Sequence, residues 1–514
     1  MPPPPPGLLA EITLRNPAQF YAGWQAAAAE LHLELPSSPA IAAGVVLDLP
    51  LGVAGLLLLD RPAYGAVVAK EGDEPALVLA LRVRSGAEVV PFFHADGPSS
   101  SPGRLSHELR LLNPGKKPAV GVIDDWLVLS SRVEALESAS AYVVRAEPAR
   151  PLPPEELVVD LPAAALHGPL DGVLRAFWQR AHDALSAAAR DARAGAGRPP
   201  DFGDPEAILA DADGKVSGFL SLLRASERVR LTEATEGARV TFAAEGTPTP
   251  GGAAAQAIAR LADGPLGALL DLPRETKMAV LLRLTAADFP RSGPPSDGGA
   301  PSAGASLSLL PPALRGIEPA LAGAAERVLA AGDGTTVLGV LGDRSVVLRR
   351  PGVDAAGAEA LATLGHAVDR PEVEQGLAPL LGKYKLREHT APLPGLGTPA
   401  FGLTLKGTET NLDLWWTVTN GTLSMAARVD GASALDQLAP KGEGERLAAD
   451  RELAERLERH GTAAGALFAL WPAAPSQGSS GSALAFWGRR AEQARFELSM
   501  PRRAALSLAR AVAP

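Results

Sequence analysis

The feature that most constrains the fold is a β-hairpin encoded around Asn420-Gly421. Asn-Gly is a preferred dipeptide of the type I′ turn, because both central residues of that turn need a positive φ. Apolar and polar residues alternate on either side of it, as in strands with one buried face. Folding the segment about this turn satisfies one register, in which Val418 lies opposite Leu423, Trp416 opposite Met425, Leu414 opposite Ala427 and Asp413 opposite Arg428. We therefore expect a hairpin here, with a cross-strand ion pair at its open end.

A similar pattern occurs earlier in the chain and indicates an internal duplication. Residues 121–133 (GVIDDWLVLSSRV) align without gaps to residues 417–429 (TVTNGTLSMAARV), which places the acidic pair Asp124-Asp125 at a turn. Residues 236–242 likewise resemble 492–498, and each segment leads through a proline into an alanine-rich helix. A chain of 514 residues is also too long for a single core. We predict two copies of one domain, at residues 7–264 and 265–514.

The periodicity of the remaining chain favours an α+β fold. Each domain is expected to be an antiparallel sheet, flat or curved, packed with helices. The apolar stretch 40–59 predicts two buried strands, and residues 291–306, rich in Gly, Pro, Ser and Asp, predict a disordered loop. Further strands are expected at residues 76–83, 87–93, 336–341 and 345–349, and helices at 17–31, 170–192, 205–223, 355–364 and 445–459.

Composition argues against several classes of function. The chain has no cysteine, which excludes disulfides and thiolate chemistry, and its net charge of −9 without a basic patch argues against nucleic-acid binding. No pair of its eight histidines has the spacing of a metal site, and no catalytic or cofactor-binding motif is intact. No stretch is long and apolar enough to predict a transmembrane helix. We expect no catalytic residue, no cofactor and no metal.

Two aromatic pairs are the candidate ligand-binding residues. Trp415 and Trp416 are adjacent on one predicted strand, so their side chains point to opposite faces of the sheet. Phe92 and Phe93 form a similar pair in the first copy. Large aromatic residues on both faces indicate either a sheet covered on both sides or a groove for an apolar ligand.

The N-terminus bears on location. Met1 is followed by five prolines, without the basic and apolar regions of a signal peptide, so residues 1–6 predict either disorder or a stiff tether left after removal of an export signal or lipid anchor. The duplicated pattern, the segment DDWLVLSSRV at 124–133 and the proline-led start resemble uncharacterised exported bacterial proteins, often lipoproteins, with two similar α+β halves. The resemblance implies a periplasmic or cell-surface location. A cytoplasmic location stays open, because the sequence has neither an export signal nor a lipid-acceptor cysteine.

Three hypotheses follow for function, in order of preference. The first is a non-catalytic cell-envelope protein that acts through contacts with a protein partner, and it predicts an exposed apolar patch. The second is a carrier or sensor of a lipid or other apolar ligand, held between sheet and helices. The third is an enzyme whose ionisable groups meet only in the folded chain.

Overall fold

The structure is a computed structural model, and it divides into two compact units. Unit 1 comprises residues 1–187, 219–256 and 492–514, and unit 2 comprises residues 188–218 and 257–491. The structure describes residues 1–512 except 70–73, 94–104, 107, 114–116, 196–204, 262–263, 265, 284–333, 354–383, 394, 396, 409, 432, 461–463 and 472–481. The predicted loop 291–306 and the predicted helix 355–364 lie outside the described residues.

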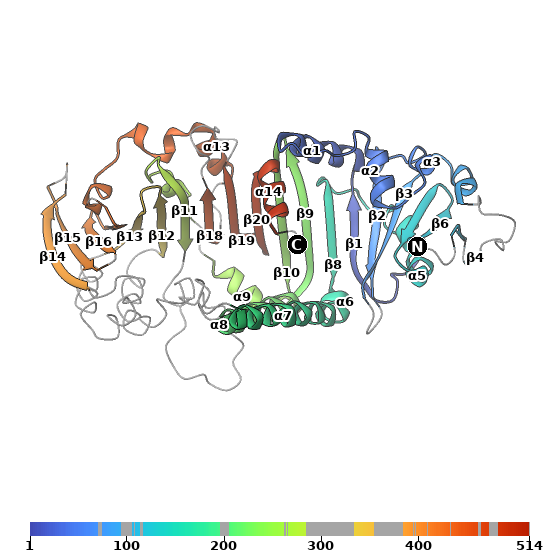
Figure 1. Cartoon of the computed structure of the whole chain (residues 1–514), viewed down its shortest axis with the longest axis horizontal. Coiled ribbons are helices and arrows are strands. Elements are labelled where there is room, and N and C mark those ends of the chain that lie inside the picture. The colour runs from blue at the N-terminus through green and yellow to red at the C-terminus, as the bar shows by residue number, and fades with distance from the viewer. Residues whose placement is uncertain are drawn as a thin grey trace. The chain divides into compact units, whose positions relative to one another are not determined.

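Unit 1 is built on an antiparallel sheet (Figure 1). Its strands lie in the order β4-β5-β6-β7-β3-β2-β1-β8-β9-β10-β20, and every neighbouring pair is antiparallel. Their bounds are β1 (Leu8–Leu14), β2 (Ala63–Val68), β3 (Ala76–Arg82), β4 (Leu105–Ser106), β5 (Leu109–Leu111), β6 (Ala119–Ile123), β7 (Trp126–Ser130), β8 (Leu157–Pro162), β9 (Ser226–Glu236), β10 (Arg239–Pro248) and β20 (Gln493–Pro501).

Helices pack on both faces of this sheet. The α-helices are α1 (Pro17–Glu30), α2 (Pro39–Val46), α3 (Leu51–Ala54), α4 (Gly86–Val89), α5 (Val133–Arg145), α6 (Ala163–Leu166) and α14 (Arg502–Val512), with the 3₁₀ helix η1 (Val90–Phe93). α7 (Pro169–Gly195) begins in unit 1, α8 (Pro205–Arg224) ends in it, and α9 (Ala253–Ala259) follows β10. Asn16 caps α1 through a 2.9 Å hydrogen bond from the Gln19 amide, which confirms the predicted N-terminus of this helix.

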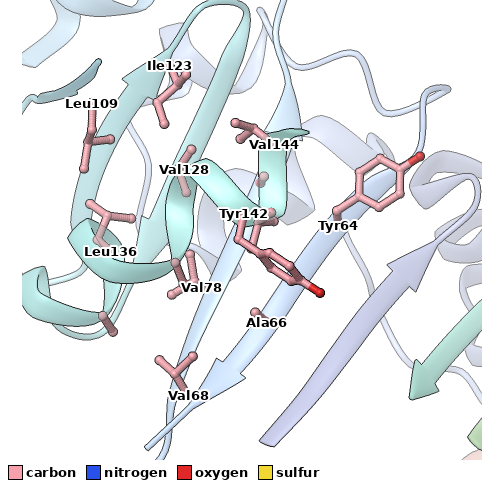
Figure 2. Close-up of a cluster of buried hydrophobic side chains, with 14 of the residues drawn as sticks. Tyr64, Ala66, Val68, Val78, Leu109, Ile123, Val128, Leu136, Tyr142 and Val144 are labelled. Carbon is pink, nitrogen blue, oxygen red and sulfur yellow. The ribbon is translucent and has the colours of Figure 1, made fainter. Parts of the chain in front are cut away.

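Each face of the unit 1 sheet has its own core. α5 covers one face with an apolar stripe that includes Leu136 and Val143, packed against Val78 and Val128 of the sheet (Figure 2). On the other face, Leu49, Val53 and Leu59 of the α2–α3 region pack on Leu81 and Leu127. The helices thus cover this second face at the end of the strands near α3.

Unit 2 is also built on antiparallel strands. Its strands lie in the order β14-β15-β16-β17-β13-β12-β11-β18-β19. Their bounds are β11 (Thr276–Arg283), β12 (Thr335–Leu341), β13 (Ser345–Pro351), β14 (Tyr384–Pro392), β15 (Pro399–Gly407), β16 (Asn411–Thr419), β17 (Thr422–Val429), β18 (Ala464–Trp471) and β19 (Ala483–Arg490). One face packs under η2 (Gly267–Leu269), η6 (Ala434–Gln437), η7 (Glu443–Glu445), η8 (Leu447–Ala449) and α13 (Arg451–His460).

The predicted hairpin is confirmed residue by residue. β16 and β17 pair in the predicted register, and Asn420 and Gly421 both have the positive φ that a type I′ turn requires, +50° and +70°. The corresponding turn in unit 1, Asp124-Asp125, joins β6 to β7 with Asp124 at φ +50°. The sequence pattern was sufficient here because the turn and the strand alternation agree on one register.

Two strand predictions are wrong. Residues 40–59 do not form two buried strands; they form α2, α3 and their connections. Ser38-Pro39 begins α2 with a side-chain cap, and Pro50 precedes α3, so prolines open both helices, as Pro17 opens α1. Residues 87–93 are also helical, in α4 and η1, where consecutive Val89 and Val90 are both buried. An uninterrupted apolar run does not distinguish a buried strand from a short buried helix.

Candidate functional site

The structure buries both predicted tryptophans, on opposite faces of β16. Trp415, 6% exposed, packs with Leu393, Ala400 and Leu438, and Trp416, 8% exposed, packs with Leu403 and other apolar residues of the opposite face. His389 stacks on Trp415 and Phe401 stacks on Trp416, with centroid distances of 5.9 and 6.4 Å. The two side chains therefore point to opposite faces, as predicted, and protein side chains surround each of them.

Asp413 fixes the position of Trp415. The Trp415 indole donates to its carboxylate at 2.8 Å, and the Ala434 amide donates to the same oxygen at 2.8 Å. Burial alone would raise the pKa of Asp413, but hydrogen bonds from Ala434, Thr404, Trp415 and Ser433 outweigh burial and lower it. Asp413 lies opposite Arg428 as predicted, but the predicted ion pair between them is not among the described salt bridges, and Arg428 instead pairs with Asp343. The carboxylate thus joins β16 to η6.

Phe92 and Phe93 lie on η1 and not on a sheet face. Phe93 packs against the apolar cluster beneath α2 and α3, whereas Phe92 is 43% exposed. The Phe92 ring lies so close to Gly52 of α3 that a Cβ at position 52 would fall 2.0 Å from a ring carbon. The structure therefore brings Phe92 to α3, and no described contact connects it with Trp415 or Trp416.

Unit 1 exposes an apolar surface whose location the sequence did not predict. Val46 at the end of α2 is 80% exposed and Leu51 at the start of α3 is 70% exposed. Three further exposed side chains come from α2 and η1. We name the whole set the hairpin patch, after the helical hairpin of α2 and α3 and not the β-hairpin of unit 2: Ile41, Val45, Val46, Leu51 and Phe92. Soluble proteins seldom expose so many large aliphatic side chains on neighbouring helices without a binding role.

The charged residues of α2, α3 and their connections are acidic. Between residues 33 and 59 the only charged side chains are Glu34 and Asp48, and both are exposed. Glu88 on α4, next to η1, is exposed as well. The patch therefore has an apolar centre flanked mainly by acidic residues, with Arg84 hydrogen-bonded through its backbone to Leu56 after α3, a combination that favours a partner with basic residues around an apolar anchor.

A second apolar surface crosses the sheet of unit 1. One row of paired residues runs over β3, β2, β1, β8, β9, β10 and β20, and we name it the sheet strip: Leu79, Gly65, Ile12, Val159, Leu231, Ala244 and Phe496. Leu231 and Phe496 are exposed, and Ile12, Leu79 and Val159 are half-buried. α1 lies at one end of β8 and β9 and α6 at the other (Figure 1), so the row lies between two helices.

The opposite face of the same strands is charged. Asp160 on β8 binds Arg228 at 2.7 Å and Arg230 at 3.2 Å, and Arg495 on β20 binds Glu497 at 2.7 Å and also Glu245. These residues alternate along the strands with those of the sheet strip. The apolar character of the strip is therefore confined to one face.

Glu147 is a buried acid, and neither of its carboxyl oxygens makes a well-formed hydrogen bond among the described residues, although the backbone of Gly65 lies close enough to oppose the rise of its pKa. It follows α5 and is 4% exposed. Burial, with a smaller effect of the nearby Glu11 carboxylate, raises the pKa of Glu147 to about 9. Glu11 itself accepts hydrogen bonds from Tyr142 and Arg150. At neutral pH, Glu147 is therefore a neutral carboxylic acid.

Two further acids, the buried Glu233 and the half-buried Glu156, lie near α1. The Trp24 indole donates to Glu233 at 2.9 Å, and Thr235 donates to Glu156. Burial raises the pKa of both carboxyls, and Arg502 opposes the shift. Glu156 also lines an open cleft of about 560 Å³, in which Arg15 is held by the Pro154 carbonyl at 2.9 Å. These groups connect α1, β9 and α14.

No described group of histidine and acidic side chains has the arrangement of a metal site. Among the described helices, none combines the length and apolarity needed to cross a membrane. The hairpin patch was missed because residues 40–59 were interpreted as strands. The repeated Asx/Ser-Pro pattern at Asn16-Pro17 and Ser38-Pro39 was the signal that could have identified the second helix.

Comparison with known proteins gives no family. No protein-family model matches the chain, and no curated protein matches it. Among solved structures, crystal forms IV, III and I of TP0453 are similar, with 10%, 9% and 11% identity and TM-scores of 0.23, 0.25 and 0.23. They cover 50%, 51% and 50% of this chain and 81%, 86% and 82% of TP0453. At these TM-scores the likeness assigns neither a fold family nor a function.

Proposed function

We propose that this is a non-catalytic protein that acts by binding a protein partner through the hairpin patch. The observation that carries the proposal is the exposure of Val45, Val46 and Leu51 on two adjacent short helices. These helices are anchored from beneath by buried Val53 and Leu49, so the exposed side chains are held on a fixed scaffold. A prearranged apolar surface lowers the entropic cost of association.

The rim distinguishes a protein partner from a membrane surface. Glu34, Asp48 and Glu88 repel the anionic lipids that attract peripheral proteins to bacterial and eukaryotic membranes. The same three carboxylates complement lysine and arginine on a protein. The partner we propose therefore carries an apolar anchor surrounded by basic side chains.

The test is chemical cross-linking in the cells that make the protein, followed by purification and mass spectrometry. We expect one polypeptide to be linked to residues 34–55 of the wild type. Val46→Glu should weaken its affinity by about thirtyfold, the loss typical of a central interface residue. Raised salt should lower the rate of association with the purified partner.

The matched control is Leu508→Glu, which places the same charge on another exposed leucine, on α14. It should leave the affinity unchanged. A partner that contacts unit 1 elsewhere, or that loses as much affinity with Leu508→Glu, would contradict the proposal. Binding of phosphatidylcholine vesicles that Val46→Glu abolishes would assign the patch to a membrane instead.

The chain is further proposed to contain two copies of one domain. The nine strands from β4 to β9 in unit 1 lie in the order 4-5-6-7-3-2-1-8-9. The nine strands of unit 2 lie in the same order when ten is added to each number, 14-15-16-17-13-12-11-18-19. The matched hairpins β6–β7 and β16–β17 occupy the same place in both orders. This agreement supports the proposed duplication, and the sequence resemblance supports the proposed cell-envelope location.

A second candidate function is carriage of an apolar ligand, and the sheet strip favours it. Leu231 and Phe496 are exposed on a sheet face that α1 and α6 border, an arrangement suited to an acyl chain lying across the strands. In this alternative the ligand contacts the strip of unit 1 and not the buried pair Trp415 and Trp416.

Native mass spectrometry of protein purified gently from its own cells tests this alternative. We expect a bound lipid at a one-to-one ratio, released by solvent extraction. Leu231→Glu should reduce its occupancy at least tenfold, since a charge on the strip would have to be buried under the ligand. Leu508→Glu, at an exposed leucine of α14 outside the strip, is the control. Protein that is always empty would exclude the carrier function.

A further inference from the structure

A cleft in unit 1 gathers three arginines beside two aromatic rings. It has a volume of about 430 Å³, and its lining includes Tyr64, Arg61, Arg82, Arg84, Asp125 and Trp126. This volume is within the range of sites for small organic ligands. The cleft is separate from the hairpin patch and the sheet strip, because none of its lining residues belongs to either set.

Backbone pairing brings the three arginines together. The Leu58 amide donates to the Arg82 carbonyl, the Arg84 amide donates to the Leu56 carbonyl, and the Arg61 amide donates to the Leu58 carbonyl, at 2.9 to 3.1 Å. The segment that follows α3 is thereby fixed against the end of β3. These three hydrogen bonds hold the backbones of Arg61, Arg82 and Arg84 next to one another.

The side chains of Arg82 and Arg84 have no carboxylate partner among the described residues, whereas Arg61 lies 3.9 Å from Asp60. The Arg82 guanidinium lies over the Trp126 ring, 4.5 Å from its centroid. Stacking uses the face of the guanidinium and leaves its N–H groups free to donate at the edge. Arg82 is thus held in place while its donors stay available to a ligand.

The aromatic rings form an apolar wall. Tyr64 meets Trp126 edge to face, with centroids 5.8 Å apart. Figure 2 shows the Tyr64 ring at the margin of the core beneath α5, with its hydroxyl pointing away from that core. The cleft therefore combines a cationic part with an aromatic part.

Charge selects the ligand class. Asp60 offsets the charge of Arg61, so Arg82 and Arg84 are the two lining cations without a carboxylate partner among the described residues, and Asp125 is already an acceptor for the Gly86 amide at 3.4 Å. Two positive charges match a phosphate monoester dianion, and the planar guanidinium of Arg82 matches two phosphate oxygens. We propose that this cleft binds the phosphate group of a phosphate monoester whose organic part packs on Trp126 and Tyr64.

Isothermal titration calorimetry of the full chain tests the proposal, with phenyl phosphate as the probe. We expect saturable one-to-one binding that weakens with added salt, and no binding of phenol, which lacks the dianion. Arg82→Gln should weaken binding between tenfold and a hundredfold, corresponding to the loss of charge-assisted hydrogen bonds (~1.5–3 kcal/mol). Arg110→Gln, at an exposed arginine of β5 outside the cleft, should have no effect.

Two further titrants identify the source of the phosphate. Inorganic phosphate that binds as tightly as phenyl phosphate would overturn the aromatic part of the proposal. Vesicles containing phosphatidic acid that compete with phenyl phosphate would support a lipid headgroup as the natural ligand, and failure to compete would support a soluble ester. Absence of saturable binding by phenyl phosphate, or equal losses for Arg82→Gln and Arg110→Gln, would overturn the site. Near-ultraviolet circular dichroism of Arg82→Gln checks that the variant keeps its fold.

Discussion

Glu147→Gln is expected to stabilise the protein by about 2 kcal/mol at pH 8, because it removes a buried acid that must otherwise stay protonated. The pKa of Glu147 is about 9 in the folded chain, whereas the ordinary value is 4.5. Between these two values the folded state holds a proton that the unfolded state has released, so stability falls as pH rises. Glutamine has nearly the same shape without the charge. Its buried amide lacks partners and offsets part of the gain.

Urea unfolding between pH 5 and pH 9 measures this effect. As pH rises over this range, the free energy of unfolding should decrease more steeply for the wild type than for Glu147→Gln. The difference between the two slopes should be up to ~1.4 kcal/mol per pH unit. Below about pH 4.5, where Glu147 is protonated in both the folded and the unfolded state, the difference between the two proteins should no longer change with pH. Glu137→Gln, at an exposed glutamate of α5, is the control and should retain the wild-type slope. Parallel pH profiles for wild type and Glu147→Gln would contradict the assignment of a raised pKa.

Trp415→Ala is expected to lower the free energy of unfolding of unit 2 by about 3 to 5 kcal/mol. The substitution empties the centre of an apolar cluster and removes the indole that donates to Asp413. Gly402 on the neighbouring strand β15 packs directly against the Trp415 ring, since a Cβ at position 402 would lie 2.6 Å from a ring carbon. Because glycine has no side chain to fill the vacated space, the substitution leaves a cavity unless the strand rearranges. Guanidinium unfolding provides the measurement.

Two variants separate packing from hydrogen bonding at this position. Trp415→Phe keeps most of the apolar volume but loses the donor to Asp413, so it should cost less than Trp415→Ala and should raise the pKa of Asp413. Trp487→Ala removes a tryptophan that is 42% exposed and should cost less than about 1 kcal/mol. Equal losses for Trp415→Ala and Trp487→Ala would show that Trp415 is not a core residue.

The parts of the fold that could be predicted are those specified by local sequence. The hairpin of β16 and β17 was predictable because Asn420-Gly421 defines the turn and strand alternation then defines every pair. α1 was predictable because Asn16 and Pro17 are both helix-start residues. In residues 40–59 nearly every side chain is apolar, so periodicity carried no information and tertiary packing decided the outcome.

The candidate surfaces were beyond prediction for a different reason. Tyr64, Arg82 and Trp126 come from three strands, and they meet only because β3 pairs with both β2 and β7. The hairpin patch likewise depends on which aliphatic side chains of α2 and α3 face the sheet, and their hydrophobicity alone does not distinguish Val53, which is buried, from Val46, which is exposed. Adjacency in space requires the strand order, and single-sequence patterns do not specify it.

The position of β20 has a consequence for the order in which the chain matures. β20 pairs with β10 in the sheet of unit 1, although residues 257–491 of unit 2 separate the two strands in sequence. During synthesis β10 emerges from the ribosome long before β20, and its outer edge has no such partner in the meantime. An unpaired edge is a template for wrong strand pairing. Unit 1 therefore begins to form before unit 2 is translated but is completed only after it, so a nascent chain depends on protection of the β10 edge until β20 has been translated.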